Sequence, residues 1–296
     1  MSGKPGIAEQ GPILDDWRPL APFGRRACRV TRNVASGGYR IFSAIDPEGP
    51  DPSAGQFYML AAESGWAAED GRPYLARAFS VADSDPEGDG VRLDFLVHGV
   101  GPGTGRLCSL REGERLWVHG PLGRPFGAPR QAVPEAHGAI LVGGGIGIAP
   151  LALWRRRLAA AGVPTRVLLG FRDRARSGGL DLFRCSELKV ASEDGHQGHR
   201  GYVTELLEVM LRGDDAGGAV VYACGPPAML EAVRVLCAAR GVACELAMEA
   251  PMACGFGACF GCAVPLAEGG YMRLCVDGPV VRGADLATAL VPGGGH

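Results

Sequence analysis

The sequence lacks a charge bias, an uninterrupted apolar segment and a signal-peptide core. Its 30 Lys and Arg residues nearly balance its 32 Asp and Glu residues, so the net charge of −2 gives no basis for nucleic-acid binding. The two longest stretches without these residues, 136–154 and 250–267, are interrupted by glycine, proline or cysteine and do not resemble membrane helices. Residues 1–16 contain no apolar signal-peptide core. We therefore expect a cytoplasmic protein that binds neither nucleic acid nor a membrane.

The residue sets of hydrolytic catalysis are also missing. No convincing Ser–His–Asp set or pair of carboxylates stands in a helix or strand context, and the six histidines lie mainly in loops or at predicted strand ends. His196 and His199 have a spacing that metal ligands can show, but a solvated loop is the stronger interpretation. The sequence therefore gives no support to a hydrolase.

Glycine and proline, in contrast, are abundant. The 296 residues include 47 glycines and 22 prolines, while 47% hydrophobic and 21% charged residues are ordinary values for a globular protein. This composition argues against helical bundles and coiled coils. It favours many turns and places where the backbone comes close to a ligand.

The chain divides into four segments by its local patterns. Residues 1–25 show little periodicity and are interpreted as an N-terminal arm. Residues 26–133 contain short β-like runs separated by turns, which is typical of an antiparallel barrel: 27–33, 38–44, 56–62, 75–81, 91–98 and 114–119. Residues 134–245 alternate strands (139–142, 166–170, 219–223) with helices (150–161, 204–212, 227–240), which predicts a parallel α/β sheet. Residues 246–296 are rich in cysteine and glycine and form a small module without a clear helix.

Four of the ten cysteines fall within this last segment. Their spacing is C-x4-C-x2-C-x12-C, formed by Cys254, Cys259, Cys262 and Cys275. Four thiolates satisfy the two irons of a [2Fe–2S] cluster, and the x4 and x2 intervals match the plant-type ferredoxin arrangement. A structural zinc site is the main alternative, although zinc prefers paired short knuckles. The other six cysteines are expected to be mostly small buried hydrophobic residues.

Two glycine-bearing turns follow predicted strands of the α/β segment. The first contains Gly143, Gly144, Gly145 and Gly147, and the second is Cys224-Gly225-Pro226. Glycines in such turns let the backbone approach a pyrophosphate, although tight packing alone can also require them. Because both turns lie at the carboxyl edge of the sheet, we expect a nucleotide site there. Arg172 and Arg174 lie near the expected ribose position, where they would either hold a 2′-phosphate or stay solvated, so NAD and NADP both stay open.

The barrel segment contains a shorter motif, Arg77-Ala78-Phe79-Ser80. On a strand, these residue types can bind a phosphate, stack on a ring and hydrogen-bond its polar edge. An ordinary strand with a surface arginine is the alternative interpretation. Loops at Leu96, Val97 and His98 and at Gly103-Thr104 are further places where the backbone can approach a cofactor.

Taken in order along residues 27–286, these motifs resemble the ferredoxin reductase-like superfamily, and more narrowly the electron transfer subunits of class 1B dihydroorotate dehydrogenase. The tail carries the most specific likeness, because Cys275-Val-Asp-Gly-Pro279 follows the three-cysteine loop. The resemblance implies an FAD-binding barrel, an NAD-binding α/β domain and a [2Fe–2S] module. It also implies that FAD contacts the Arg77–Ser80 strand and the loops at Leu96–His98 and Gly103-Thr104. His98 stands where the family often has arginine.

The activity implied by this resemblance is electron transfer in pyrimidine biosynthesis. An FMN-containing dihydroorotate dehydrogenase catalytic subunit, expected in a heterotetramer, would deliver electrons through the cluster and FAD to NAD⁺. The alternatives are a subunit of another complex (sulfide dehydrogenase, ferredoxin:NADP oxidoreductase or hydrogenase type) and a non-enzymatic redox-sensing or metal-sensing module that has lost nucleotide binding. Related subunits of the first two types tend to carry Asp at the first cluster position, so Cys254 favours the dihydroorotate family.

Overall fold

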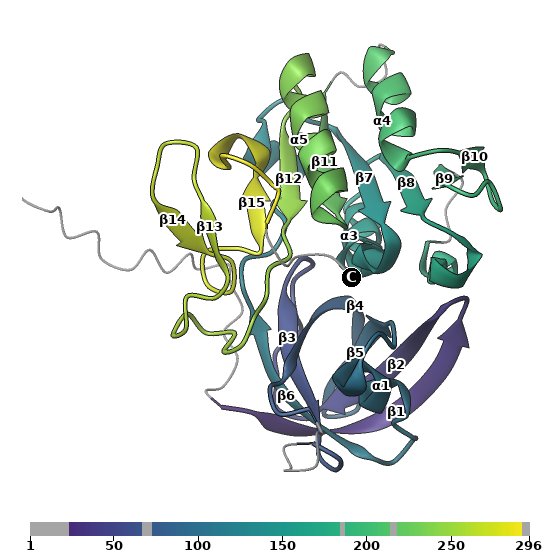
Figure 1. Ribbon diagram of the computed structural model, residues 1–296, viewed down its shortest axis with the longest axis vertical. Helices are drawn as coiled ribbons and strands as arrows, with labels where there is room; N and C mark the ends of the chain where they lie inside the picture. Colours follow the sequence, from purple (N-terminus) through teal and green to yellow (C-terminus); the bar gives the residue numbers. More distant parts are fainter. Residues whose placement is uncertain (1–23, 67–72, 184–186, 214–217, 292–296) are drawn as a thin grey trace, which may run out of the picture.

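The structure is a computed structural model that describes residues 24–66, 73–183, 187–213 and 218–291. Of the N-terminal arm predicted for residues 1–25, only residues 24 and 25 lie within these ranges. None of the helices in the described ranges is both long and apolar enough to cross a membrane. The chain folds into a barrel, a seven-stranded sheet with helices on its two faces, and a small two-stranded sheet beside them (Figure 1).

The first half of the chain forms a closed antiparallel barrel, as predicted. Six strands are hydrogen-bonded in the order β1-β2-β5-β4-β3-β6. Helix α1 (Pro102–Cys108) lies between the last two of them in sequence, where the sequence predicted only a loop. The strands are β1 (Arg26–Ser36), β2 (Tyr39–Asp46), β3 (Phe57–Ala62), β4 (Arg77–Glu87), β5 (Gly90–Val97) and β6 (Arg115–Leu122).

The second half forms a sheet of order β10-β9-β8-β7-β11-β12-β15. Its pairs are parallel except for the last, in which β15 runs antiparallel to β12. The strands are β7 (Gly138–Gly144), β8 (Thr165–Phe171), β9 (Leu188–Ser192), β10 (His199–Arg200), β11 (Ala219–Cys224), β12 (Cys244–Ala247) and β15 (Val280–Arg282). The helices are α2 (Pro129–Ala132), α3 (Ala149–Ala160), α4 (Val203–Arg212) and α5 (Pro227–Arg240). The predicted parallel α/β sheet is therefore confirmed.

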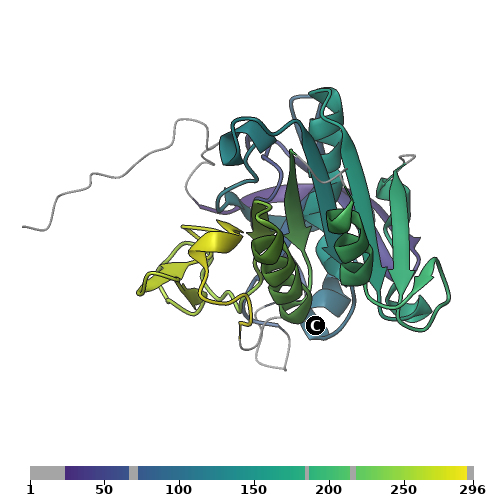
Figure 2. The same ribbon diagram turned by 90° about the horizontal axis from the view of Figure 1, so that it is seen from above.

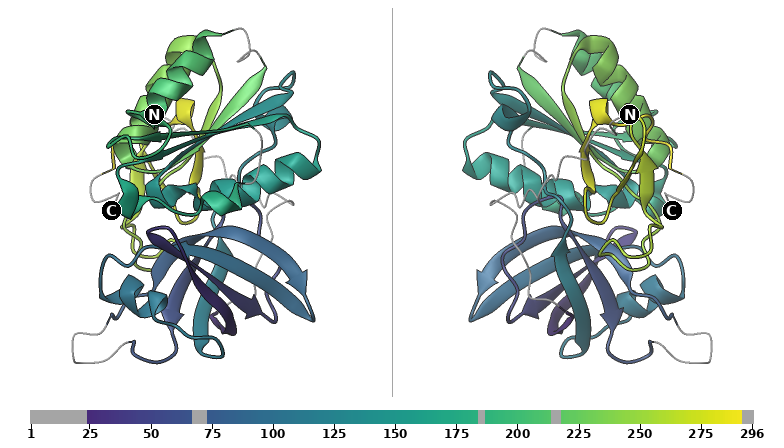
Figure 3. Two further views of the ribbon diagram at one scale, coloured as in Figure 1. Left: turned by 90° about the vertical axis from the view of Figure 1, so that its right-hand side faces the viewer. Right: turned by 90° about the vertical axis from the view of Figure 1, so that its left-hand side faces the viewer.

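The helices cover both faces of the sheet. Helix α3 lies on the face towards the barrel, and α4 and α5 lie on the opposite face (Figures 2 and 3). Every residue of β7 is buried, as a strand covered on both faces requires. Ala139 and Leu141 of β7 belong to the core shared with α3 and the barrel, whereas Ile140 and Val142 belong to the core under α4 and α5.

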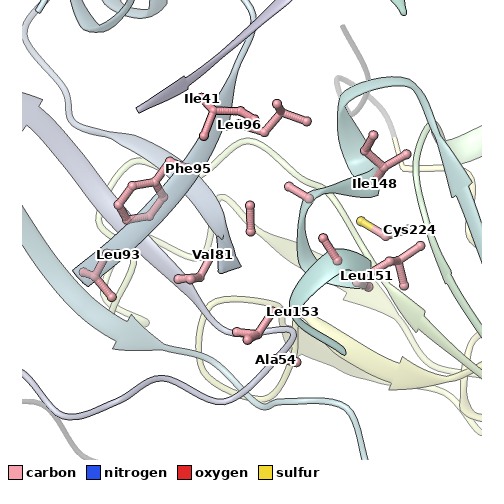
Figure 4. Close-up of a cluster of buried hydrophobic side chains, with 14 of the residues drawn as sticks. Ile41, Ala54, Val81, Leu93, Phe95, Leu96, Ile148, Leu151, Leu153 and Cys224 are labelled. Atoms are coloured by element: carbon pink, nitrogen blue, oxygen red, sulfur yellow. The ribbon is translucent and has the colours of Figure 1, made fainter. Parts of the chain in front are cut away.

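One continuous apolar cluster joins the barrel to the sheet. Figure 4 shows Val81, Phe95 and Leu96 of the barrel near Ile148 and Leu151 at the start of α3. All five side chains are at most 1% exposed. Because this contact is a packed core, it holds the barrel and the sheet in a fixed relation to each other.

The cysteine-rich segment is attached to the sheet. Strands β13 (Ala263–Pro265) and β14 (Tyr271–Arg273) form a hairpin, and β15 then adds to the edge of the large sheet. These strands and β12 were not predicted from the sequence. Strand β12 runs across residues 245 and 246, where the sequence suggested a boundary, so the division into domains stays a proposal.

Candidate functional site

A cavity of about 530 Å³ lies between the barrel and the sheet. The barrel side of its wall includes strand β4, the end of β5, helix α1 and Phe57 of β3. The sheet side consists of the glycine turn after β7, the end of β11 and the segment that follows β12. The predicted site residues in this wall are Arg77, Ala78, Phe79, Ser80, Leu96, His98, Gly103, Thr104, Gly147 and Cys224.

Strand β4 presents its motif at this cavity because it pairs with β3. Phe79 is opposite Tyr58, and Ser80 is opposite Phe57, which itself lines the cavity. Arg77 donates a hydrogen bond to the Leu75 carbonyl, and this bond holds its guanidinium at the start of strand β4. The wall thus brings together a cation, an aromatic ring and a hydroxyl.

A second cavity of about 560 Å³ follows the carboxyl edge of the sheet. It is lined by Gly144, Gly145 and Gly147 from the first turn and by Gly225 and Pro226 from the second. The two turns meet because β7 and β11 are neighbours, with Gly143 opposite Cys224. The predicted convergence of the glycine turns on one cavity is therefore present.

Close packing of these turns also requires glycine. A Cβ atom on Gly147 would lie 2.6 Å from the Gly225 Cα, and one on Gly144 would lie 2.6 Å from the Met229 Sδ. Gly143 lines neither cavity, and a Cβ there would lie 2.8 Å from Ile148 Cγ2. Val97 is likewise fully buried in the barrel core and lines neither cavity, so its predicted cofactor contact has no support in this geometry.

The two cavities share a wall made of His98, Ile146, Gly147 and Glu249. Burial raises the pKa of the Glu249 carboxyl to about 7. Burial also raises the pKa of the neighbouring Cys224 thiol well above its usual range, and the charge of Glu249 adds to this shift. A carboxyl that titrates near neutrality therefore stands where the two cavities meet.

Sequence reasoning missed several residues of this site. Glu249 belongs to no motif, and only its position after β12 brings it to the cavities. Tyr39 lines the second cavity, where its ring lies 5.2 Å from the His98 ring and its hydroxyl donates to the Arg176 carbonyl. Met248 lines the first cavity and is 3% exposed. No local sequence signal marks these three positions.

The four predicted cluster cysteines form two pairs. The Sγ atoms of Cys262 and Cys275 are 3.3 Å apart, and the Cys275 backbone N–H points at the Cys262 sulfur over 3.5 Å. The Cys254 and Cys259 side chains interact with each other, and this interaction helps to lower the pKa of the Cys254 thiol. Two adjacent thiol pairs fit a group with two irons, each of which takes two thiolates. In the described ranges, no group of three or more His, Cys, Asp or Glu side chains surrounds one metal position.

The backbone around the cysteines favours the thiolate form of Cys254. Burial alone would raise the pKa of this thiol, but hydrogen bonds, mainly from the N–H groups of Cys259, Phe256 and Ala258, outweigh burial and lower the pKa to about 6. Burial, followed by the contact with Cys262, raises the pKa of the Cys275 thiol to about 12. Binding of a cationic cluster would therefore displace the Cys275 proton.

The cysteine loop packs directly on the barrel. Gly255 lies against Met59 of β3, and a Cβ on Gly255 would be 2.6 Å from the Met59 Cγ. Along the chain, residues 248–252 line the first cavity, and Cys254 follows two residues later. The chain thus runs from the wall of the first cavity directly to Cys254, and the loop that follows packs on the barrel.

Comparison with known proteins agrees with this arrangement. Residues 249–287 match a family described as the iron–sulfur cluster binding domain of dihydroorotate dehydrogenase B, which favours the iron–sulfur interpretation over zinc. A relative from Caldanaerobacter subterraneus subsp. tengcongensis is 34% identical, with 84% of this chain and 92% of the relative covered. One from Geobacillus thermodenitrificans is 37% identical, with 74% and 82% covered. Both are named dihydroorotate dehydrogenase B (NAD(+)), electron transfer subunit.

Solved structures show the same fold. The NADH-dependent reduced ferredoxin–NADP oxidoreductase has a chain with 27% identity and a TM-score of 0.73, and the match covers 90% of this chain and 92% of the other. The ferredoxin reductase of carbazole 1,9a-dioxygenase has a TM-score of 0.60 at 23% identity, with 76% and 68% covered. The sequence matches and the thiol pairs beside a barrel–sheet cavity lead to one conclusion: the chain belongs to the family of electron transfer subunits of dihydroorotate dehydrogenase B.

Proposed function

We propose that this electron transfer subunit binds FAD in the 530 Å³ cavity, NAD⁺ in the 560 Å³ cavity and a [2Fe–2S] cluster on its four paired cysteines. The observation that carries this proposal is the continuity of the three places. The two cavities share a wall, and the segment 248–252 of the first cavity leads directly to Cys254. When bound, FAD exchanges electron pairs with a nicotinamide and single electrons with an iron–sulfur cluster.

The barrel residues supply binding and orientation in this proposal. Arg77 offers a fixed cation for a phosphate of FAD, and helix α1, with Gly103 and Thr104, closes the same side of the cavity. Phe79 supplies an aromatic face, and Ser80 supplies a hydroxyl for the polar edge of the flavin ring. His98 stands between the two cavities and limits how far a ligand of one reaches into the other.

The sheet residues hold the nucleotide. The turn of Gly144, Gly145 and Gly147 precedes helix α3, so its backbone presents N–H groups to a pyrophosphate. Gly225 and Pro226 form the opposite side of this cavity, whereas Cys224, one residue before them, lines the first cavity. Glu249 in that wall has a pKa that burial raises to about 7, and it lies next to the position proposed for the nicotinamide.

The name of the family, electron transfer subunit, implies a partner subunit, and we propose that electrons come to this chain from that partner. We propose that the partner is an FMN-containing catalytic subunit that oxidises dihydroorotate, assembled with this chain as a heterotetramer in the cytoplasm. The four cysteines, Cys254, Cys259, Cys262 and Cys275, would hold the cluster between that partner and the flavin cavity. The segments 26–133, 134–245 and 246–296 would then be the FAD, NAD and cluster domains.

Two measurements on the purified chain test this proposal. Addition of NADH is expected to bleach the absorbance of the bound flavin. The complex with a candidate catalytic subunit is expected to reduce NAD⁺ when dihydroorotate is added. Cys275→Ser should abolish the second activity and preserve the first, whereas Cys108→Ser, a change outside the cluster loop, should preserve both. A purified chain without flavin and iron would contradict the proposal. A bound flavin that keeps its colour with NADH would also contradict it, and this result would favour the sensor alternative.

A further inference from the structure

We infer that Glu193 selects NAD over NADP by accepting hydrogen bonds from the adenosine ribose and repelling a 2′-phosphate. The inference rests on the proposed nucleotide site and adds the residue that determines its specificity. Glu193 lines the 560 Å³ cavity and follows strand β9 directly. The family motifs discussed above do not include it.

The order of strands places Glu193 at the end of the cavity remote from the flavin. Across the carboxyl edge of the sheet, the cavity wall passes from Glu249 after β12, over Gly225 after β11 and the glycine turn after β7, to β8 and β9. Adjacent strands are about 4.8 Å apart, so β9 lies roughly 14 Å from β11. A dinucleotide with its nicotinamide at the shared wall therefore has its adenosine near β8 and β9.

Backbone hydrogen bonds hold Glu193 beside Arg172. The Glu193 N–H donates to the Phe171 carbonyl over 3.1 Å, and the Asp194 N–H donates to the Arg172 carbonyl over 3.3 Å. Arg172 and Glu193 both line the cavity and are both exposed. The acidic residue and the basic residue thus come from adjacent strand ends and face one space.

The charges in this space balance. Arg176 also lines the cavity, but its guanidinium is paired with Asp173 at 2.6 Å. No hydrogen bond or ion pair joins the side chain of Glu193 or Arg172 to another residue in the described ranges, so both are available to a ligand. Arg174, which the sequence suggested as a 2′-phosphate ligand, does not line the cavity. One free cation beside one free carboxylate gives no net attraction for a phosphate group.

The chemistry of the ribose decides between the two nucleotides. A ribose 2′-hydroxyl donates a hydrogen bond, which a carboxylate accepts strongly. A 2′-phosphate carries negative charge and at neutral pH mainly accepts hydrogen bonds, so a carboxylate at the same place repels it. Tyr202, which is 59% exposed and lines the same cavity, offers an aromatic face for the adenine ring.

The test uses nucleotide fragments that carry no nicotinamide. Isothermal titration of the purified flavin-loaded chain compares ADP-ribose with 2′-phospho-ADP-ribose. We expect the wild-type chain to bind ADP-ribose more tightly. Glu193→Gln should narrow that preference by about tenfold, since it removes the repulsive charge and weakens the acceptor. Glu187→Gln, an exposed change just before the start of β9 and outside the cavity, should leave the preference unchanged.

Two results would overturn the inference. One is a wild-type chain that binds 2′-phospho-ADP-ribose at least as tightly as ADP-ribose and loses that binding in Arg172→Gln. The other is a preference in Glu193→Gln equal to that of the wild type. Flavin bleaching by NADH, measured on the same samples, reports separately on the proposed function. If NADH bleaches the flavin of the wild-type chain while Glu193→Gln keeps the wild-type preference for ADP-ribose, only the role of Glu193 is refuted.

Discussion

Replacing Gly255 by alanine is expected to destabilise the cysteine loop for two separable reasons. Gly255 has φ +79°, a left-handed conformation that costs an L-residue about 1–2 kcal/mol. The added Cβ would also lie 2.6 Å from Met59 Cγ and 3.0 Å from its Sδ, and overpacking of this kind costs about 1–3 kcal/mol. The two costs together come to about 2–5 kcal/mol, so Gly255→Ala should lose its cluster much more readily than the wild type.

The hairpin of the same module provides a matched control. Gly269 has φ +91°, but a Cβ there would meet no atom within 4 Å. Gly269→Ala therefore carries the backbone cost alone, about 1–2 kcal/mol. The double change Met59→Ala with Gly255→Ala removes the close contact and should cost less than the sum of the two single changes by about 1–3 kcal/mol.

The assay is iron content and cluster absorbance after reconstitution, followed by urea titration of the cluster absorbance. We expect the urea midpoint to decrease in the order wild type, Gly269→Ala, Gly255→Ala. Equal midpoints for the two alanine variants would show that the contact with Met59 has no cost. A Gly255→Ala chain with full iron content and the wild-type midpoint would refute the described packing of the loop on the barrel.

Three further predictions concern the barrel and the sheet. Asp46 and Arg26 form a buried ion pair 2.6 Å long, with side chains that are 1% and 7% exposed. Asp46→Asn breaks this pair and should lower the free energy of unfolding, measured by urea denaturation, by about 3–5 kcal/mol. An unchanged urea midpoint would contradict this. Burial raises the pKa of Glu245 to about 7, so the folded chain holds an extra proton between about pH 4.5 and 7 and loses up to about 3 kcal/mol of stability as the pH rises through that window. In denaturation measured at several pH values, Glu245→Gln should make stability fall less steeply with rising pH. An equally steep fall in the variant would refute the raised pKa of Glu245. Arg77→Gln should weaken FAD binding about tenfold or more in ultrafiltration assays, whereas the exposed Arg32→Gln should not, and equal retention by both would remove Arg77 from the site.

The parts that the sequence predicted have local chemical signals. Helix α5 spans Pro227–Arg240 as expected, since proline stands at its start and Gly241 closes it with φ +63°. Helix α3 lies within one residue of its predicted range at each end, because a proline stands near its start as well. The spacing of the four cysteines is equally local. Signals of this kind need only a few neighbouring residues, so they are readable without the fold.

The parts that the sequence did not predict depend on distant contacts. Strand β15 has three residues, too few to show periodicity, and it forms because β12 offers it an open edge more than 30 residues earlier in the chain. Glu249 and Glu193 carry no motif and become site residues only where strand order brings their loops to the cavities. The sequence described the cysteine-rich segment as a separate module. In the structure, β15 of this segment pairs with β12 and so joins the segment to the large sheet.

The glycine-rich turn shows where composition and function must be separated. From the sequence, these glycines are explained either by the approach of a nucleotide or by tight packing. At Gly147 the structure shows tight packing, since a Cβ there would lie 2.6 Å from the Gly225 Cα. Loss of activity in Gly147→Ala would therefore report on packing between two loops. Gly145 differs, because the atom nearest to a Cβ there would be the Tyr39 hydroxyl oxygen, 3.7 Å away, and Tyr39 lines the same cavity. Only at Gly145 does added bulk enter the nucleotide space without displacing the protein, although its φ of +55° adds a backbone cost that any comparison must include.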